Sequence, residues 1–316
     1  MNRDERSLDL LTIGEPIVCL DTQGHRLDHA TALHVSLGGA ECNVAIGLAR
    51  LGLRTSLVGR IGDDPFGRAA RRRLLAEEVD VSHLAIDDAA PTAVLFKEQT
   101  YRGAEVHYRR AGCAGSRIAL ADVETLPVEQ ARAVHVTGVT GALGAGPRAA
   151  VVRLAQRASA NGARVSLDAN FRLKLAAVDE LVDMFHAVSV HADDVLMGWG
   201  DAALVAGDDA EEGIRSMMVS LDRPCVVVKR PAGGAICLER GRWLSQDAPA
   251  ATVVDPVGAG DAFAVGFLYE RLNGGTTATA LASGATIAAR VIGMHGDNAA
   301  LPYAADLAPT RAGVAR

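Results

Sequence analysis

A glycine-rich turn followed by an aspartate is the strongest chemical signal in this sequence. Residues 253–267 read VVDPVGAGDAFAVGF: an apolar run, a tight turn and an alanine-rich stretch of helical character. Glycines allow a sharp turn with exposed backbone N–H groups, and at the start of a helix such groups bind phosphate oxygens. Gly258, Ala259 and Gly260 are therefore expected to form an anion-binding turn.

Asp261 lies at the mouth of this expected turn. A carboxylate beside a phosphate site is electrostatically unfavourable, so it needs a purpose, and the most direct one is to accept the proton of an attacking hydroxyl group. The structural alternative is a helix cap, because aspartate is a preferred N-cap residue. The length of the motif favours the catalytic interpretation, in which Asp261 is the base of a phosphoryl transfer.

The elements that would position this turn follow from the pattern of apolar runs. Short β-rich runs recur at residues 10–13, 55–58, 133–136, 164–167, 225–228 and 235–238. Between many of them lie helical stretches rich in Ala, Leu and Arg, such as residues 43–51, 65–78 and 147–161. This alternation predicts an α/β fold with a mainly parallel sheet, helices on both faces, and ligands at the carboxyl ends of the strands.

Two stretches, about residues 18–37 and 92–110, interrupt the alternation. In the second, residues 92–97 and 105–109 flank the turn Tyr101-Arg102-Gly103 as in a hairpin. We expect both stretches to form a small β-sheet that acts as a lid and excludes water. An edge extension of the main sheet is the alternative. Because no repeat or linker divides residues 1–316, we expect a single domain that carries this lid.

Composition excludes several classes of function. The 316 residues carry 32 Lys and Arg against 38 Asp and Glu, and the formal charge is -6. Nucleic-acid and membrane partners are therefore not expected, since both need a clustered positive field. The 5 cysteines form no C-x-x-C pair, which argues against a disulfide framework or a zinc site. We recognise no secretion signal or membrane span, so we expect a cytoplasmic protein.

The motif at residues 255–261, DPVGAGD, resembles the C-terminal signature of the ribokinase-like carbohydrate kinases, the PfkB family. Residues 38–67, GGAECNVAIGLARLGLRTSLVGRIGDDPFG, are similar to the N-terminal signature, and the two follow the family's order. The resemblance covers about residues 11–303. It implies an α/β/α sandwich with a β lid, ATP with Mg²⁺, Asp261 as base, and the amides of residues 258–261 around the transferred phosphoryl group.

Within the family the sequence most resembles the 2-keto-3-deoxygluconate kinases. The strings that carry this likeness are GEP at residues 14–16, YRRAGCAGS at 108–116, DANFR at 168–172 and VVVKR at 226–230. These kinases act on a sugar acid. The resemblance therefore implies a substrate with a carboxylate.

The same resemblance implies the residues that bind substrate. It places Tyr108 and Arg110 on the substrate, Gly39 and Asn43 on its hydroxyls, and Arg172 between substrate and phosphates. The forked donors of arginine suit a carboxylate or a phosphate. Surface ion pairs for the two arginines, and a helix cap for Asn43, are the alternatives.

For the nucleotide and the metal, the resemblance implies contacts from Asn170, Arg172, His191, Lys229, Gly234, Gly258 and Gly260. Residues 229–234, KRPAGG, resemble the ATP loop, although Pro231 replaces the usual glycine and removes an N–H; a plain turn is the alternative. The N-x-x-E pattern for magnesium corresponds to HADD at residues 191–194. Asp194 is thus the expected metal contact, through water, with His191 near the edge of the nucleotide.

The sequence therefore predicts ATP-dependent phosphorylation of a terminal hydroxyl of a sugar acid, most closely 2-keto-3-deoxygluconate to its 6-phosphate. Kinases for a neutral sugar such as fructose or ribose, for a deoxy-inositol breakdown acid or for a nucleoside are alternatives. A more distant one is a catalytically silent regulator that binds sugar or nucleotide. A dinucleotide-dependent dehydrogenase is disfavoured because no G-x-G-x-x-G follows the first strand. Exposed lid strands favour a homodimer or higher homo-oligomer.

Overall fold

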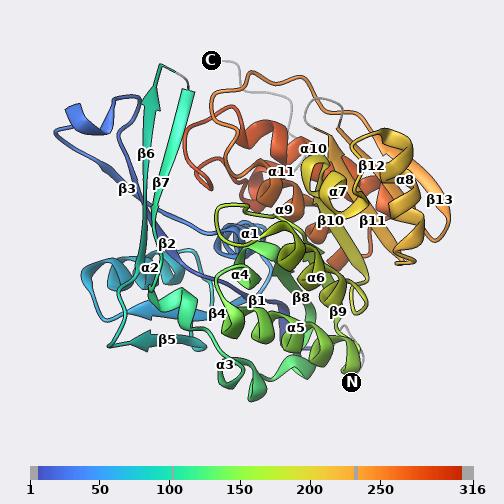
Figure 1. Ribbon diagram of the computed structural model, residues 1–316, viewed down its shortest axis with the longest axis horizontal. Helices are drawn as coiled ribbons and strands as arrows, with labels where there is room; N and C mark the ends of the chain where they lie inside the picture. The colour runs from blue at the N-terminus through green and yellow to red at the C-terminus, as the bar shows by residue number, and fades with distance from the viewer. Residues whose placement is uncertain (1–5, 102, 231–233, 308–316) are drawn as a thin grey trace.

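Two β-sheets organise the computed structural model, which describes residues 6–101, 103–230 and 234–307 (Figure 1). In their order across the larger sheet, its nine described strands are β13 (Arg242–Gln246), β12 (Gly234–Glu239), β11 (Cys225–Arg230), β10 (Asp194–Gly198), β9 (Arg164–Asp168), β8 (Ala131–Thr137), β1 (Leu8–Ile13), β4 (Thr55–Gly62) and β5 (Leu84–Asp87). All neighbours from β11 to β5 are parallel. The pairs β11–β12 and β12–β13 are antiparallel.

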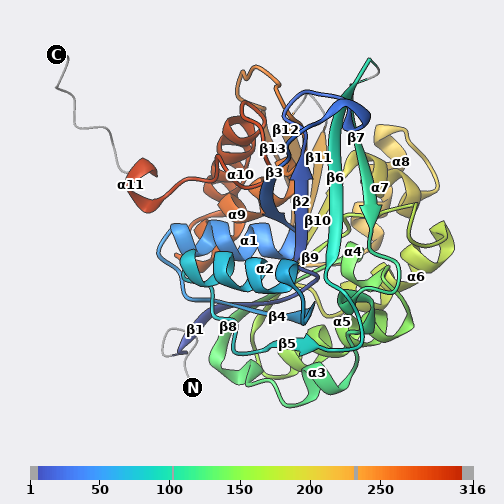
Figure 2. The same cartoon turned by 90° about the vertical axis from the view of Figure 1, so that its left-hand side faces the viewer.

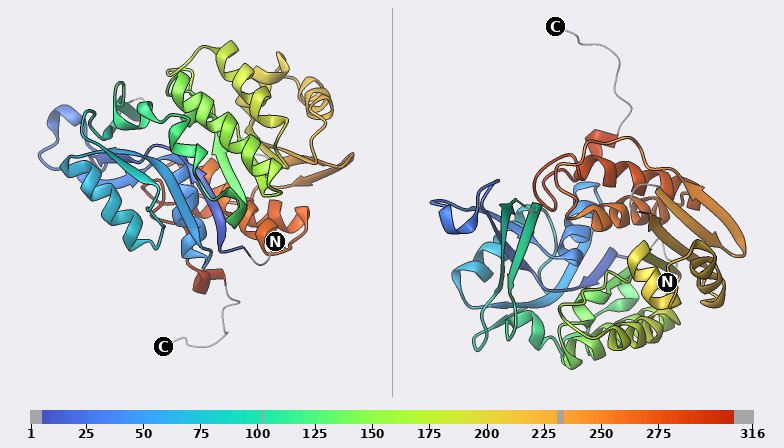
Figure 3. Two further views of the ribbon diagram at one scale, coloured as in Figure 1. Left: turned by 90° about the horizontal axis from the view of Figure 1, so that it is seen from below. Right: turned by 45° about the horizontal axis from the view of Figure 1, so that its top comes forward.

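Helices cover both faces of the larger sheet (Figure 3). One layer contains α5 (Ala145–Ala160), α6 (Val178–Ser189), α7 (Trp199–Ala206) and α8 (Glu211–Ser220). The opposite layer contains α1 (Ala40–Arg50), α2 (Pro65–Ala76), α9 (Ala259–Leu272) and α10 (Thr277–Val291). Alternate residues of a strand face opposite layers, so Val134 and Val136 pack toward α5 and Ala133 packs toward α9. The predicted α/β/α sandwich is confirmed.

The shorter helical segments lie between these elements. They are the α-helices α3 (Ala121–Glu124), α4 (Gly138–Gly141) and α11 (Ala304–Leu307), and the 3₁₀ helices Leu27–His29, Ala114–Arg117 and Val128–Gln130. No helix in the described ranges has both the length and the apolar composition needed to cross a membrane.

The smaller sheet stands beside the body, and its strands run side by side in Figure 2. Its order is β3 (His34–Gly38), β2 (Ile17–Asp21), β6 (Ala93–Thr100) and β7 (Gly103–Arg109). The antiparallel pair β6–β7 is the expected hairpin, with Arg102 of its turn outside the described residues. The interrupting stretches thus pair with one another, and the alternative of an edge extension of the main sheet is wrong.

The larger sheet brings three distant parts of the chain to one edge. Asp168 ends β9, Gly198 ends β10, and Lys229 lies near the end of β11, where it pairs in register with Gly198. The register of β9 with β10 sets Asp168 opposite Leu196. Because parallel strands share their direction, these carboxyl ends meet, and α9 begins beside them.

Candidate active site

Two cavities meet at the start of α9. The larger, about 530 Å³, is lined by the strand ends and by α9 and α10; its walls include Asp168, Trp199, Lys229, Gly260 and Phe263. The smaller, about 300 Å³, lies between the small sheet and the body; its walls include Gly39, Asn43, Tyr108, Arg110 and Asp261. Pro256, Ala259, Gly260 and Asn170 belong to both walls. The glycine-rich turn is therefore the boundary between two ligand-sized spaces.

The turn itself depends on glycine at position 258. Gly258 has φ 82°, a left-handed conformation, and it immediately precedes α9. A Cβ atom there would lie only 2.5 Å from the backbone oxygen of Asp297. The amide of Ala259 donates to the backbone oxygen of Pro256 over 3.4 Å. The next two amides, of Gly260 and Asp261, have no carbonyl one turn earlier in the helix to accept from them, so they are oriented to bind an anion.

Asp261 lies in the first turn of α9 and is held by a chain of amide side chains. Asn43 Nδ2 donates to Asp261 Oδ2 over 2.8 Å, and Asn298 Nδ2 donates to Asn43 Oδ1 over 3.0 Å and to the backbone oxygen of Leu37 over 2.8 Å. These contacts fix the donor end of Asn43 toward Asp261. Asn43 is interior to α1, whose N-cap is Gly39, so the alternative that it caps this helix is wrong.

Burial raises the pKa of Asp261 from 3.8 to about 7, and the charges of Asp168 and Asp297 add to this effect. The hydrogen bond from Asn43 and the charge of Arg172 oppose it. A carboxylate with a pKa near neutrality can both accept and release a proton at physiological pH.

The smaller cavity joins residues of the small sheet to residues of the body. Arg110 Nε donates to Glu15 Oε2 over 2.9 Å, and its guanidinium lies over the Tyr108 ring at 5.4 Å. Gly39, with φ 115°, packs so closely on the backbone oxygen of Glu15 that a Cβ would lie 2.6 Å from it. Arg172 is exposed on the far wall. The substrate residues expected from the sequence are thus all brought to one cavity.

Two buried acids of this cavity wall were not foreseen. Glu41, in the first turn of α1, accepts from the hydroxyls of Thr137 and Thr140, the first over 2.6 Å. Burial raises the pKa of Glu41, and it also raises the pKa of Glu15, where the charge of Arg110 opposes it. The available signal for Glu41 was an acid in the first turn of a helix whose following residues are mostly apolar.

The larger cavity gathers four of the seven residues expected on the nucleotide, namely Asn170, Lys229, Gly234 and Gly260, while Arg172 and Gly258 line the smaller cavity. Lys229 Nζ donates to Asp168 Oδ2 over 2.7 Å, and a Cβ added to Gly260 would lie 3.6 Å from that ammonium. Asn170, with φ 38°, and Gly234 also line the cavity. Residues 231–233 of the expected ATP loop, Pro231 among them, lie outside the described residues.

Comparison with known proteins identifies the family of this chain. A model of the pfkB family carbohydrate kinases matches residues 9–304. The chain belongs to that family. It is therefore an ATP-dependent carbohydrate kinase, and its fold and its two signatures agree with that membership.

Relatives of this kinase include named sugar-acid kinases. The 2-dehydro-3-deoxygluconokinase of Thermoproteus tenax is 34% identical over 94% of this chain and 92% of its own length. The 2-dehydro-3-deoxygalactonokinase of Haloferax volcanii is 31% identical over 92% of each chain. A crystal structure of the 2-dehydro-3-deoxygluconokinase of Thermotoga maritima superposes with a TM-score of 0.84 at 25% identity, covering 92% of this kinase and 95% of that chain.

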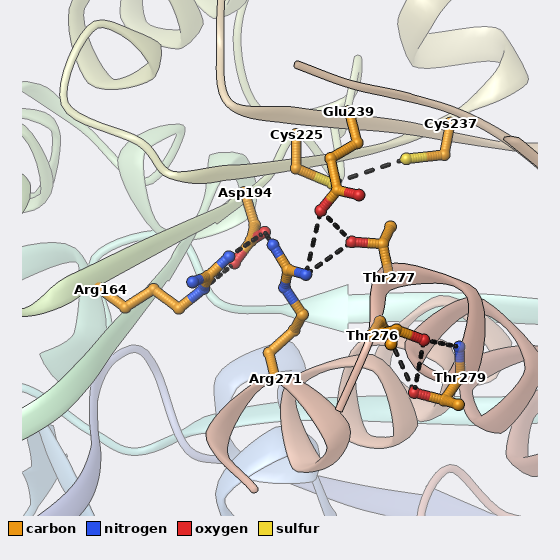
Figure 4. Close-up of polar contacts among 9 residues, drawn as sticks. All are labelled: Arg164, Asp194, Cys225, Cys237, Glu239, Arg271, Thr276, Thr277 and Thr279. Atoms are coloured by element: carbon orange, nitrogen blue, oxygen red, sulfur yellow. Dashed lines mark hydrogen bonds and ion pairs between the residues drawn. The ribbon is translucent and has the colours of Figure 1, made fainter. Parts of the chain in front are cut away.

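The prediction of Asp194 as the metal contact is wrong. Asp194 begins β10, at the opposite end of the strand from the cavities, and it is fully buried. Its carboxylate is held by Arg164, with one bond of 2.8 Å, and by Arg271 at 3.4 Å (Figure 4). His191 lies on the connection that leads into β10, and it lines neither cavity. Its predicted place at the edge of the nucleotide is therefore wrong as well.

The acids that do face the larger cavity are Asp168 and Asp201. Asp201 is three residues after Gly198, in the first turn of α7, and it accepts from the amides of Gly198 and Phe171 over 3.3 Å each. Burial raises the pKa of Asp201, and the neighbouring charge of Asp168 adds to this. The N-x-x-E pattern was matched to residues 191–194, at the start of β10. In the structure an acid with the same spacing, Asp201 three residues after Gly198, follows the end of that strand. The rule that ligands lie at carboxyl ends would have selected this position.

Replacing Asp194 by Asn is expected to lower the free energy of unfolding by about 3 kcal/mol, because it leaves the partly buried guanidinium of Arg164 without its anion. Urea unfolding measures this change. The remaining folded enzyme should keep its normal dependence on divalent cation. A stable variant that required more Mg²⁺ would restore Asp194 as a metal residue.

Replacing Asp261 by Asn is expected to stabilise the fold at neutral and higher pH. Asp261 binds its proton more tightly folded than unfolded, so its contribution to stability is lost as pH rises from 3.8 through about 7. The gain should be at least about 1 kcal/mol above neutrality, since each pKa unit corresponds to about 1.4 kcal/mol. Thermal unfolding across pH measures it, and a gain that persists in strong acid would contradict this explanation.

Proposed function

We propose that this kinase transfers the γ-phosphoryl group of ATP to the terminal hydroxyl of 2-keto-3-deoxygluconate, also called 2-dehydro-3-deoxygluconate, and forms its 6-phosphate. The observation that carries the proposal is the meeting of the two cavities at residues 256–260, with Asp261 at their boundary. ATP would occupy the larger cavity, and the sugar acid would occupy the smaller one. The two relatives named above, a 2-dehydro-3-deoxygluconokinase and a 2-dehydro-3-deoxygalactonokinase, support an acid of this type.

In the proposed mechanism Asp261 accepts the proton of the terminal hydroxyl. The hydroxyl oxygen forms its bond to the γ-phosphorus while the bond from that phosphorus to the bridging oxygen of ADP breaks, and Asp261 later releases the proton to solvent. Amides at the start of α9 would stabilise the charge on the transferred group. Asn43 would orient the base, since it donates directly to Asp261 Oδ2.

Magnesium fits the acids of the larger cavity. Among the described residues, buried Asp168 Oδ1 has no hydrogen-bond partner, and Asp201 stands close enough for the charge of Asp168 to raise its pKa. Two adjacent carboxylates with an unused oxygen suit a hard cation, held directly or through water. Bound there, Mg²⁺ would neutralise phosphate charge. Lys229, next to Gly260, would bind phosphate oxygens from the same side.

Selectivity for an acid would come from the two arginines of the smaller cavity. Arg110 uses Nε and Nη2 to hold Glu15, and a guanidinium has further donors for a substrate carboxylate. Arg172 faces the same space and lowers the pKa of Asp261 by its charge, so it lies within electrostatic reach of the reacting group. Tyr108 and Gly39 would complete the contact with the sugar.

The small sheet would act as the lid of this site. Leu95, Val106, Tyr108 and Arg110 contribute its side of the smaller cavity. We further propose a cytoplasmic location, because the reaction consumes ATP. We also propose a homodimer formed through the lid, whose outer strands are β3 and β7 in the described part of the sheet.

Replacing Asp261 by Asn is expected to lower kcat by about 10² to 10⁴, the usual contribution of a general base, with little change in ATP affinity. In the unmodified enzyme, kcat/KM should rise with pH and level off above about 7, as the carboxylate becomes ionised. Coupled assay of ADP release and calorimetry of nucleotide binding measure these quantities. Glu270→Gln, at the far end of the same helix, is the matched control. A near-normal rate in Asp261→Asn would remove the base from its role.

Replacing Arg110 by Ala is expected to raise KM for the sugar acid about tenfold or more while leaving KM for ATP unchanged, because a charge-assisted contact with the carboxylate is lost. ADP release measured with 2-keto-3-deoxygluconate, fructose and ribose tests this. Arg109→Ala, the exposed neighbour on β7, serves as control. Faster turnover of fructose or ribose than of the acid would favour the neutral-sugar alternative. Nucleotide binding without turnover of any acceptor would favour a silent regulator.

A further inference from the structure

Lys97 is a buried lysine of the small sheet that has no part in the mechanism above. It lies on β6, and only 5% of its surface is exposed. Its ammonium forms an ion pair with Asp255 and lies 3.9 Å from Asp297 Oδ1. Burying a charge costs several kcal/mol unless it is well paired. A buried ion pair between the small sheet and the body is therefore a candidate for a functional role.

The two acids that Lys97 joins shape the anion-binding turn from both sides. Asp255 opens the turn, where its Oδ1 accepts from the amide of Val257 over 3.1 Å. Its Oδ2 accepts from the amide of Gly296 over 3.4 Å, which ties the turn to the segment after α10. In that segment, the backbone oxygen of Asp297 packs directly against Gly258. The positions of these two segments therefore determine the shape of the turn.

Without a cation, these acids would repel each other. Burial raises the pKa of Asp297, the charges of Asp255 and Asp21 add to the shift, and the charge of Lys97 opposes it. Within the described ranges, every ion pair of Asp255 and Asp297 goes to Lys97. Asp21, on the neighbouring strand β2, is the further charged group whose field acts on this lysine.

We propose that Lys97 is a positioning residue for phosphoryl transfer: its ammonium neutralises Asp255 and Asp297 and links the docking of the small sheet to the shape of the anion-binding turn. This inference rests on the proposed function of that turn. Leu95, two residues earlier on the same face of β6, lines the smaller cavity. The strand that contacts the sugar therefore also holds the site of the phosphoryl group.

The test compares Lys97→Met, which removes the charge at similar length, with Gln99→Ala, an exposed position on the same strand. We expect Lys97→Met to lower kcat about tenfold to hundredfold, as displaced catalytic groups do, with a smaller change in KM for the sugar acid. Backbone amides of residues 256–261 should exchange their hydrogens faster. Gln99→Ala should resemble the unmodified enzyme in both measurements.

Two further variants separate a positioning role from simple destabilisation. In Lys97→Ala, added ammonium or methylammonium should restore part of the lost kcat, because a small cation can enter the vacated space. In the double variant Lys97→Met with Asp297→Asn, removal of one of the two uncompensated acids ends their mutual repulsion, so the hydrogen exchange should become slower than in Lys97→Met. If Lys97→Met fails to fold, the double variant should fold, because one of the two repelling acids has been removed; failure of both variants to fold would contradict the inference.

Normal kcat together with unchanged exchange at residues 256–261 in Lys97→Met would overturn the inference. Loss of activity without faster exchange would overturn it too. The exchange measurement needs no turnover, so it remains decisive even if the unmodified chain phosphorylates no sugar. If the unmodified chain phosphorylated no sugar, the proposed function would be wrong, but the link between Lys97 and the turn would still be tested by hydrogen exchange.

Discussion

A phosphoryl-transfer site must attract a strongly negative group and keep a carboxylate beside it. In the proposed mechanism both demands fall on one turn, where Gly258 and Gly260 would supply the anion-binding backbone and Asp261 would supply the acid. Burial limits the charge of Asp261, because its pKa is raised to about 7. Other acids near the site form ion pairs with basic side chains: Asp168 with Lys229, Glu15 with Arg110, and Asp255 with Lys97. Each pair joins different elements, so compensation of charge also holds the tertiary structure together.

The topology of the larger sheet explains why these groups meet. Parallel strands place their carboxyl ends at one edge, so Asp168 after β9, Asp201 after β10 and Lys229 on β11 share a cavity although they are far apart in sequence. The start of α9 forms one wall of that cavity and, on its other side, a wall of the smaller cavity. In the proposed mechanism a single helix terminus would serve both ligands, and this arrangement would satisfy the requirement that attacking and departing oxygens lie on opposite sides of the transferred group.

The sequence predicted most of this arrangement, because its strongest signals are local. The turn at residues 258–260, the hairpin of β6 and β7, and the α/β alternation each depend on neighbouring residues. The strand β13 was not predicted, since most of its residues are exposed and give no apolar run. Asp194 was assigned to metal from the likeness of residues 191–194 to the N-x-x-E pattern, and so short a pattern carries no information about which end of the strand the acid occupies. Glu15, Glu41 and Lys97 could not be assigned roles, because their partners lie far away along the chain or on other elements.

The small sheet is tethered to the body by four separate peptide crossings: after β1, before α1, before β6 and after β7. Several contacts brace these crossings against one another. Glu15 of the first crossing bonds Arg110 of the fourth and touches Gly39 of the second, while the amide of Ala114 donates to the oxygen of Pro91 over 2.9 Å to join the last two. A sheet that is attached along this line of four connections, here called the seam, cannot move as a loop with a single hinge does. Its remaining freedom is a tilt about the seam, which would carry all four strands together.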